Sequence, residues 1–167
     1  PRPPKKKTDI KIEDGKLEIS YPFDASIKEN LDVLQKLVVN NISALNFKIS
    51  KDLEKISHED VSALSYIRSK LMKIQEVEVI VWNRPISDEA LLEVFLCLFW
   101  KNDSLTRINL QFNLGRFFEK TLLFLGESVF PATKNLKELV LSFDVCSMKD
   151  ETCSLLNQSI SQLAHNL

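Results

Sequence analysis

A recurring pattern of apolar residues limits what this 167-residue chain can fold into. Each unit has a lead residue, followed by apolar residues three, five and seven positions later. The units start at positions 14, 42, 74, 105 and 136, so they are separated by 28, 32, 31 and 31 residues. Their apolar triplets are Leu17, Ile19 and Tyr21; Leu45, Phe47 and Ile49; Val77, Val79 and Val81; Ile108, Leu110 and Phe112; and Leu139, Leu141 and Phe143. Such self-similarity is the signature of a repeat array, in which each unit packs on its neighbours.

Within each unit, the alternation is followed by a stretch with helical spacing. Strict alternation predicts a strand, and apolar residues three to four positions apart predict a helix. In four units a serine followed by acidic residues predicts the helix N-terminus: Ser26, Ser57, Ser87 and Ser147. In the fourth unit Arg116 and Phe117 stand at this place, so the sequence does not fix where that helix begins.

These units predict an α/β protein in which each helix leads to the next parallel strand. No G-x-G-x-x-G loop marks the switch point of a doubly wound, dinucleotide-binding sheet. The apolar residues stand at the same offsets in every unit. This regularity favours a stack that grows in one direction, a solenoid of about five repeats over residues 8–167. We place their boundaries at 8–41, 42–73, 74–104, 105–135 and 136–167.

An Asp-Gly pair predicts a β-hairpin at the start of the array. Asp14-Gly15 lies between alternating runs, which is typical of a type I′ turn. Folding about it sets Glu13 opposite Lys16 and Lys11 opposite Glu18, so both polar pairs are opposite in charge. We expect residues 8–13 to form an antiparallel strand that caps the open edge of the first repeat strand.

Composition narrows the possible partners and compartments. The net charge is −1, which argues against a nucleic-acid partner for the chain as a whole. Three cysteines without C-x-x-C spacing indicate a reducing compartment, so we expect an intracellular protein, cytoplasmic or in an organelle. The longest apolar run, 90–100, is too short for a membrane span. Residues 1–7, P-R-P-P-K-K-K, are a basic tail, either solvated or an arm for an acidic partner, anionic lipid or nucleic acid.

Candidate catalytic or metal-binding groups do not form a pattern. His58 and His165 are the only histidines and are more than a hundred residues apart, and no Cys/His cluster suits zinc. Cys97 and Cys153 fall within helix stripes, where burial keeps a thiol inert. Glu76 and Glu78 share a strand face like a pair of catalytic carboxylates, yet no residue beside them would give the two the different roles that glycoside hydrolysis requires. The sequence therefore predicts no enzymatic activity, no cofactor, no metal ion and no small-molecule substrate.

The strand segments carry a resemblance to a known family. L-T-R-I-N-L-Q-F-N at 105–113 and L-K-E-L-V-L-S-F-D at 136–144 resemble the L-x-x-L-x-L-x-x-N segment of leucine-rich repeats. The helical parts, such as I-S-D-E-A-L-L-E-V-F at 86–95, resemble the ribonuclease-inhibitor-like subclass. The family's Asn position holds Asn113, Asp144, Trp82, Ser50 and Pro22, which departs from a continuous Asn ladder. The resemblance implies a parallel sheet on a concave face, helices on a convex face, and binding of proteins through the concave face.

The pleat predicts which side chains form that face. If the apolar residues point inward, their neighbours point outward. The protein-binding candidates are Lys16, Glu18, Asn46, Lys48, Glu76, Glu78, Arg107, Asn109, Gln111 and Glu138. Arg107 has Glu76 and Glu138 at the same position on the adjacent strands, and this arrangement fits either a self-neutralised charge ladder or a partner site.

We therefore expect a protein–protein interaction scaffold, or an assembly subunit of a larger complex. The alternatives, drawn from the resemblance alone, are the substrate-recognition part of a ubiquitin-ligase-type complex and a regulator of a small GTPase. Leu167 stands where a sixth lead residue belongs, so we expect the array to continue beyond the given chain. Further repeats or another subunit would then cover the last strand's edge.

Overall fold

A computed structural model describes residues 9–22, 42–49, 52–71, 73–82, 85–99, 103–113, 119–144 and 150–164. Within these residues six strands form one sheet: β1 (Ile10–Glu13), β2 (Lys16–Tyr21), β3 (Ala44–Ile49), β4 (Glu76–Trp82), β5 (Arg107–Asn113) and β6 (Glu138–Asp144). The helices are α2 (His58–Lys70), α3 (Asp88–Phe99), α4 (Glu119–Phe124), a π-helical turn η1 (Leu125–Val129), α5 (Phe130–Ala132) and α6 (Asp150–Ala164). The chain is an α/β protein.

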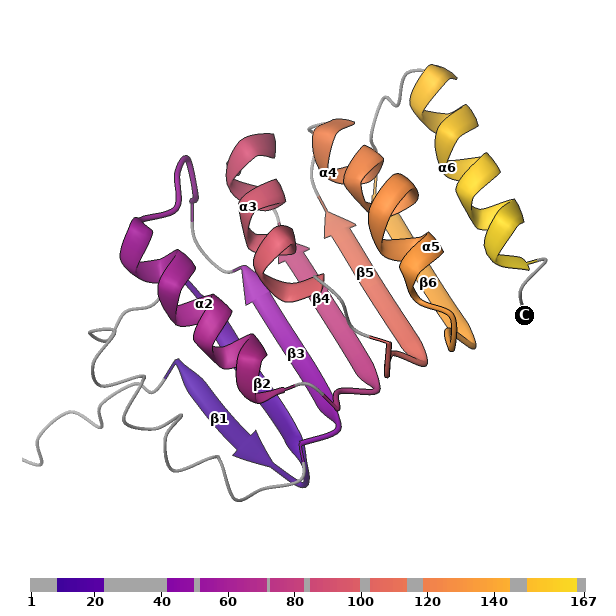
Figure 1. The fold of residues 1–167 in the computed structure, drawn as a ribbon. Coiled ribbons are helices and arrows are strands. Elements are labelled where there is room, and N and C mark those ends of the chain that lie inside the picture. The colour runs from indigo at the N-terminus through magenta and orange to yellow at the C-terminus, as the bar shows by residue number, and fades with distance from the viewer. Residues whose placement is uncertain are drawn as a thin grey trace, which may run out of the picture.

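The strands lie side by side in the order of the chain (Figure 1). The pair β1–β2 is antiparallel, and every later pair is parallel. The pairing confirms the strand alignment that the sequence predicts, since Leu17, Leu45, Val77, Ile108 and Leu139 are successive partners across the sheet. Backbone hydrogen bonds also connect the segments just before the strands of successive units. There the carbonyls of Ser43, Gln75 and Thr106 each accept backbone N–H groups from the next unit.

The predicted hairpin is confirmed in register. Glu13 pairs with Lys16, Ile12 with Leu17, Lys11 with Glu18 and Ile10 with Ile19. Asp14 and Gly15 have φ of 48° and 76°, the left-handed values that a type I′ turn needs at both central residues. The described strand is β1, Ile10–Glu13; Asp9 of the predicted range 8–13 is not part of it, and residue 8 lies outside the described residues.

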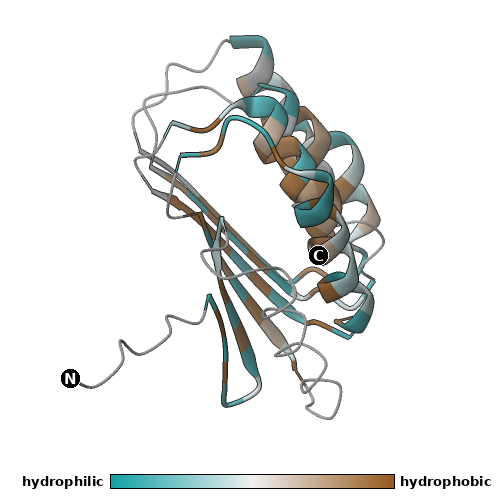
Figure 2. Cartoon of the chain, turned by 90° about the vertical axis from the view of Figure 1, so that its left-hand side faces the viewer, coloured by the Kyte–Doolittle hydropathy of each residue, from teal (hydrophilic) through white to brown (hydrophobic). Residues whose placement is uncertain are grey.

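The helices lie along one face of the sheet and leave the other face without a helix among the described residues (Figure 2). Between the two layers the inward strand residues meet the apolar stripes of the helices. Val79, Leu110, Leu64, Leu91 and Leu125 are all fully buried there. Burial of such side chains stabilises the fold by about 1.5–3 kcal/mol each.

The core is less complete at β6 than the sequence predicts. Leu139 and Leu141 are only partly buried, whereas their partners Ile108 and Leu110 on β5 are fully buried. Ile160 on α6 is also 36% exposed. β6 is the last strand of the described sheet, so its side chains have a neighbouring strand on one side alone.

Helix starts are fixed by the predicted serines where the structure describes them. Ser57 Oγ accepts the backbone N–H of Asp60 at 3.1 Å, and Ser87 Oγ accepts that of Ala90 at 3.1 Å. The start of α4, which its own sequence does not mark, is capped by the preceding unit. The carboxylate of Asp88 accepts the backbone N–H groups of Lys120 at 2.7 Å and Thr121 at 3.0 Å.

Several sequence predictions lie outside the described residues. They concern the basic tail 1–7, Ser26, Ser147, Cys146, His165 and Leu167. Among the described helices, none is long and apolar enough to cross a membrane.

Candidate functional site

The sheet face opposite the helices, which we call the open face, presents three rows of side chains. Each row crosses the strands at one register position and alternates with buried core residues. The first row is Lys16, Ala44, Glu76, Arg107 and Glu138; the second is Glu18, Asn46, Glu78, Asn109 and Val140; the third is Ser20, Lys48, Ile80, Gln111 and Ser142. The structure brings all ten predicted protein-binding residues together on this face.

The first row contains a charge ladder. Arg107 Nη1 lies 3.7 Å from a carboxylate oxygen of Glu76, and Arg107 Nε lies 3.1 Å from one of Glu138. The three side chains are 44%, 53% and 51% exposed, so water screens these pairs and each contributes at most about 1 kcal/mol. This geometry favours the self-neutralised charge ladder over a partner site in which Arg107 is unpaired.

The second row is tied together by hydrogen bonds across three strands. Asn46 Nδ2 donates to Glu78 Oε2 at 2.6 Å, and Asn109 Nδ2 donates to Glu78 Oε1 at 2.8 Å. The carboxylate fixes both amide orientations, because a flipped amide would set its oxygen against another oxygen. Glu78 is therefore held between two neutral amides.

This bridge leaves two acceptors without donors. Asn46 Oδ1 and Asn109 Oδ1 are buried and have no hydrogen-bond partner among the described residues. Asn46 as a whole is only 6% exposed, although it belongs to the face away from the helices. A buried polar atom without a partner costs about 1–3 kcal/mol, and such atoms in a native fold call for an explanation.

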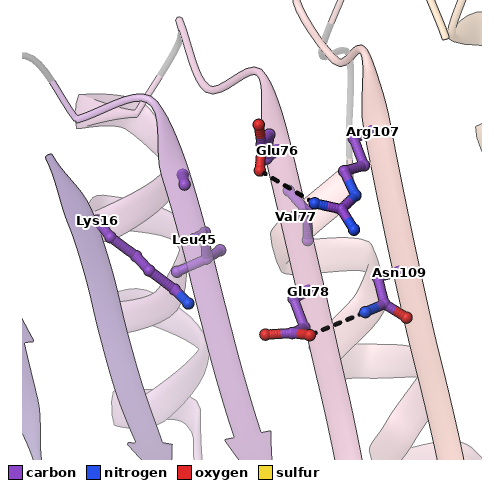
Figure 3. Close-up of a pocket in the computed structure, with 8 residues that line it drawn as sticks. Lys16, Leu45, Glu76, Val77, Glu78, Arg107 and Asn109 are labelled. Carbon is purple, nitrogen blue, oxygen red and sulfur yellow. Dashed lines mark hydrogen bonds and ion pairs between the residues drawn. The ribbon is translucent and has the colours of Figure 1, made fainter. Parts of the chain in front are cut away.

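Two hollows flank the bridge on the open face. The first has a volume of about 190 Å³ and lies over Ala44, between Lys16 on one side and Glu76, Glu78 and Arg107 on the other (Figure 3). The second, of about 140 Å³, includes Asn46 and reaches the hairpin strand β1. Ala44 is the smallest side chain of the first row, which is why the surface is hollowed there.

On the helix side, a hollow of about 560 Å³ is lined by Lys55, Ile56, Ser57, His58, Val61 and Glu93. Cys97 is buried and its pKa is raised, mainly by burial; Ser65 Oγ donates to its sulfur at 3.8 Å. A thiol in this state is a poor nucleophile. His58 is exposed in the first turn of α2. Among the described residues, no group of three or more His, Cys, Asp or Glu side chains is placed to hold a metal ion.

Sequence reasoning named Asn46, Glu78 and Asn109 separately but missed the bridge between them. The signal was present, because an amide, a carboxylate and an amide occupy the same register position in three successive units. Comparison of the chain with protein-family models, with curated proteins and with solved structures finds no match.

Proposed function

We propose that the chain is a leucine-rich-repeat-type solenoid that binds another protein through the open face. Parallel strands in chain order, with helices along the opposite side, support the solenoid, and its open face would be the concave one. The ordered polar surface formed by the three rows carries the binding proposal. Family members use the corresponding face in this way.

The strongest support is that polar groups on this face are held in fixed positions, yet do not use all of their hydrogen-bonding capacity. Glu78 is held by two amides whose oxygens have no donor among the described residues. A docked protein can supply donors to the unused lone pairs of the Glu78 carboxylate and exclude water at the same place. The ubiquitin-ligase and small-GTPase alternatives are supported by the resemblance alone.

Quantitative affinity capture with the full chain tests this function. Lys48→Glu with Ser142→Arg changes two exposed positions of the open face. The matched control, Lys55→Glu with Ser128→Arg, makes the same changes at exposed positions outside it. A partner of the open face should be lost from the first variant and kept by the second. Equal retention, or equal loss, by both variants would contradict the proposal.

We also retain the prediction that another strand covers the outer edge of β6. The incomplete burial of Leu139 and Leu141 supports it, because a further strand beside β6 would bury both. Further repeats or another subunit would each supply such a strand.

A further inference from the structure

We propose that Glu78, with Asn46 and Asn109 beside it, recognises an arginine side chain that the protein partner presents to the open face. This proposal rests on the proposed function and specifies the chemistry of its contact. It combines the charge pattern of the face, the unused lone pairs of the Glu78 carboxylate and the hollow beside Glu78.

Glu78 differs from the other carboxylates of the two rows in its neighbours. Glu76 and Glu138 share Arg107, and the register sets Glu18 beside Lys11. At its own register position Glu78 has amides on both neighbouring strands, and it makes no ion pair within the described part of the chain, although Lys16 and Arg107 line the same hollow. The two amide groups therefore hold the Glu78 carboxylate in place, and its negative charge can pair with a cation from a partner.

The hydrogen-bonding balance indicates which cation fits. Each oxygen of Glu78 accepts one amide N–H and retains capacity for a second bond. A guanidinium group has five N–H donors in a planar fork and no acceptor, so it complements the two carboxylate oxygens of Glu78.

The hollow over Ala44 provides the space. It lies next to Glu78 and Asn109, and its volume of about 190 Å³ accommodates one long side chain (Figure 3). Lys16 lines the same hollow, but it forms no ion pair with Glu78. The Lys16 ammonium is a flexible, strongly hydrated charge that an incoming guanidinium would displace toward solvent. Lys16 is thus a competitor of the partner's arginine.

An NMR titration of the full chain tests the site without knowledge of the partner. The probe is N-acetyl-arginine amide, and N-acetyl-citrulline amide is its neutral counterpart of similar shape. The side-chain amide signals of Asn46 and Asn109 should shift saturably with the arginine probe. The citrulline probe should bind about tenfold more weakly, since it lacks the charge-assisted hydrogen bonds. Equal responses to the two probes would overturn the proposal.

Three variants connect the response to the named residues. Glu78→Gln should abolish the preference for arginine. Glu127→Gln removes the same charge from an exposed position on η1 and should keep that preference. Lys16→Met should tighten binding of the arginine probe, because it removes the competing cation. Wild-type affinity in Glu78→Gln, or weaker binding in Lys16→Met, would refute the site.

The proposed function and this site can fail separately. If the open-face variant loses a captured protein that Glu78→Gln still binds at full strength, the function stands and the arginine contact is wrong. If no captured protein depends on the open face while the arginine probe responds as expected, the site stands and the scaffold function is wrong.

Discussion

The buried hydroxyl of Tyr21 joins the sheet to a helix at the scale of a single residue. Tyr21 is fully buried and stacks on Phe47 with ring centroids 5.8 Å apart. Its hydroxyl donates to Asp60 Oδ2 at 3.0 Å in the first turn of α2. Burial, followed by the negative charge of Asp60, raises the pKa of Tyr21 far above its usual value.

This environment predicts how stability depends on alkaline pH. An unfolded tyrosine loses its proton near pH 10, about its ordinary pKa, while folded Tyr21 keeps it. The unfolded state then binds fewer protons, so the free energy of unfolding should fall as the pH rises above about 10. In a Tyr66→Phe variant, which leaves Tyr21 as the sole tyrosine, tyrosinate absorbance should appear only as circular dichroism is lost. Ionisation near pH 10 with the fold intact would contradict this.

At the scale of elements, α4 depends on its neighbour for its N-terminus. Asp88 begins α3 and caps α4 through the N–H groups of Lys120 and Thr121, and Thr121 Oγ1 donates to the same carboxylate at 2.7 Å. Asp88→Ala should lower the free energy of unfolding by about 0.5–2 kcal/mol, as the loss of a helix cap does. Denaturant unfolding measures this, and hydrogen exchange at the Thr121 amide should accelerate.

The matched control is the next residue. Glu89 forms an exposed ion pair with Lys120 but accepts no backbone N–H of α4. Glu89→Gln should leave stability almost unchanged, because exposed pairs contribute little. If Asp88→Ala proved as mild as Glu89→Gln, the shared cap would have no energetic role.

The hairpin turn gives a second prediction at this scale. Gly15 has a φ of 76°, so Gly15→Ala should cost about 1–2 kcal/mol and increase hydrogen exchange at the amides of β1. Asp14 also has a positive φ, 48°, which glycine tolerates, and Asp14→Gly should therefore be close to neutral. A Gly15→Ala variant as stable as wild type would mean that the turn does not fix the register.

These elements show how far the sequence could predict the fold and where it could not. Strand register followed from alternation, and the hairpin register from Asp14-Gly15 with its two charge pairs. The cap by Asp88 was not predicted, because it joins residues 32 and 33 positions apart. The π-helical turn η1 was also missed; Pro131, which lacks an N–H, is the second residue of α5, the helix that follows η1. The bridge at Glu78 was missed because it depends on side-chain rotamers in three units.

At the scale of the whole molecule, the core is continuous up to β5 and thins at β6. Leu110 is fully buried, whereas its neighbour Leu141 is only partly buried. Leu110→Ala should lower the free energy of unfolding by about 2–5 kcal/mol, and Leu141→Ala should cost clearly less. Denaturant unfolding of the isolated chain at low concentration measures both, with Ser142→Ala as the exposed control. Equal costs at the two leucines would show that β6 is already covered.

The order of the strands has a consequence for how such a protein can change through evolution. Every strand of the described sheet pairs only with the strands that precede and follow it in the chain. Duplication or loss of one strand–helix unit would lengthen or shorten the sheet without rewiring any other pairing. Each unit also contributes one position to every row of the open face. A change in unit number would therefore alter the length of the open face while the chemistry around Glu78 stayed intact.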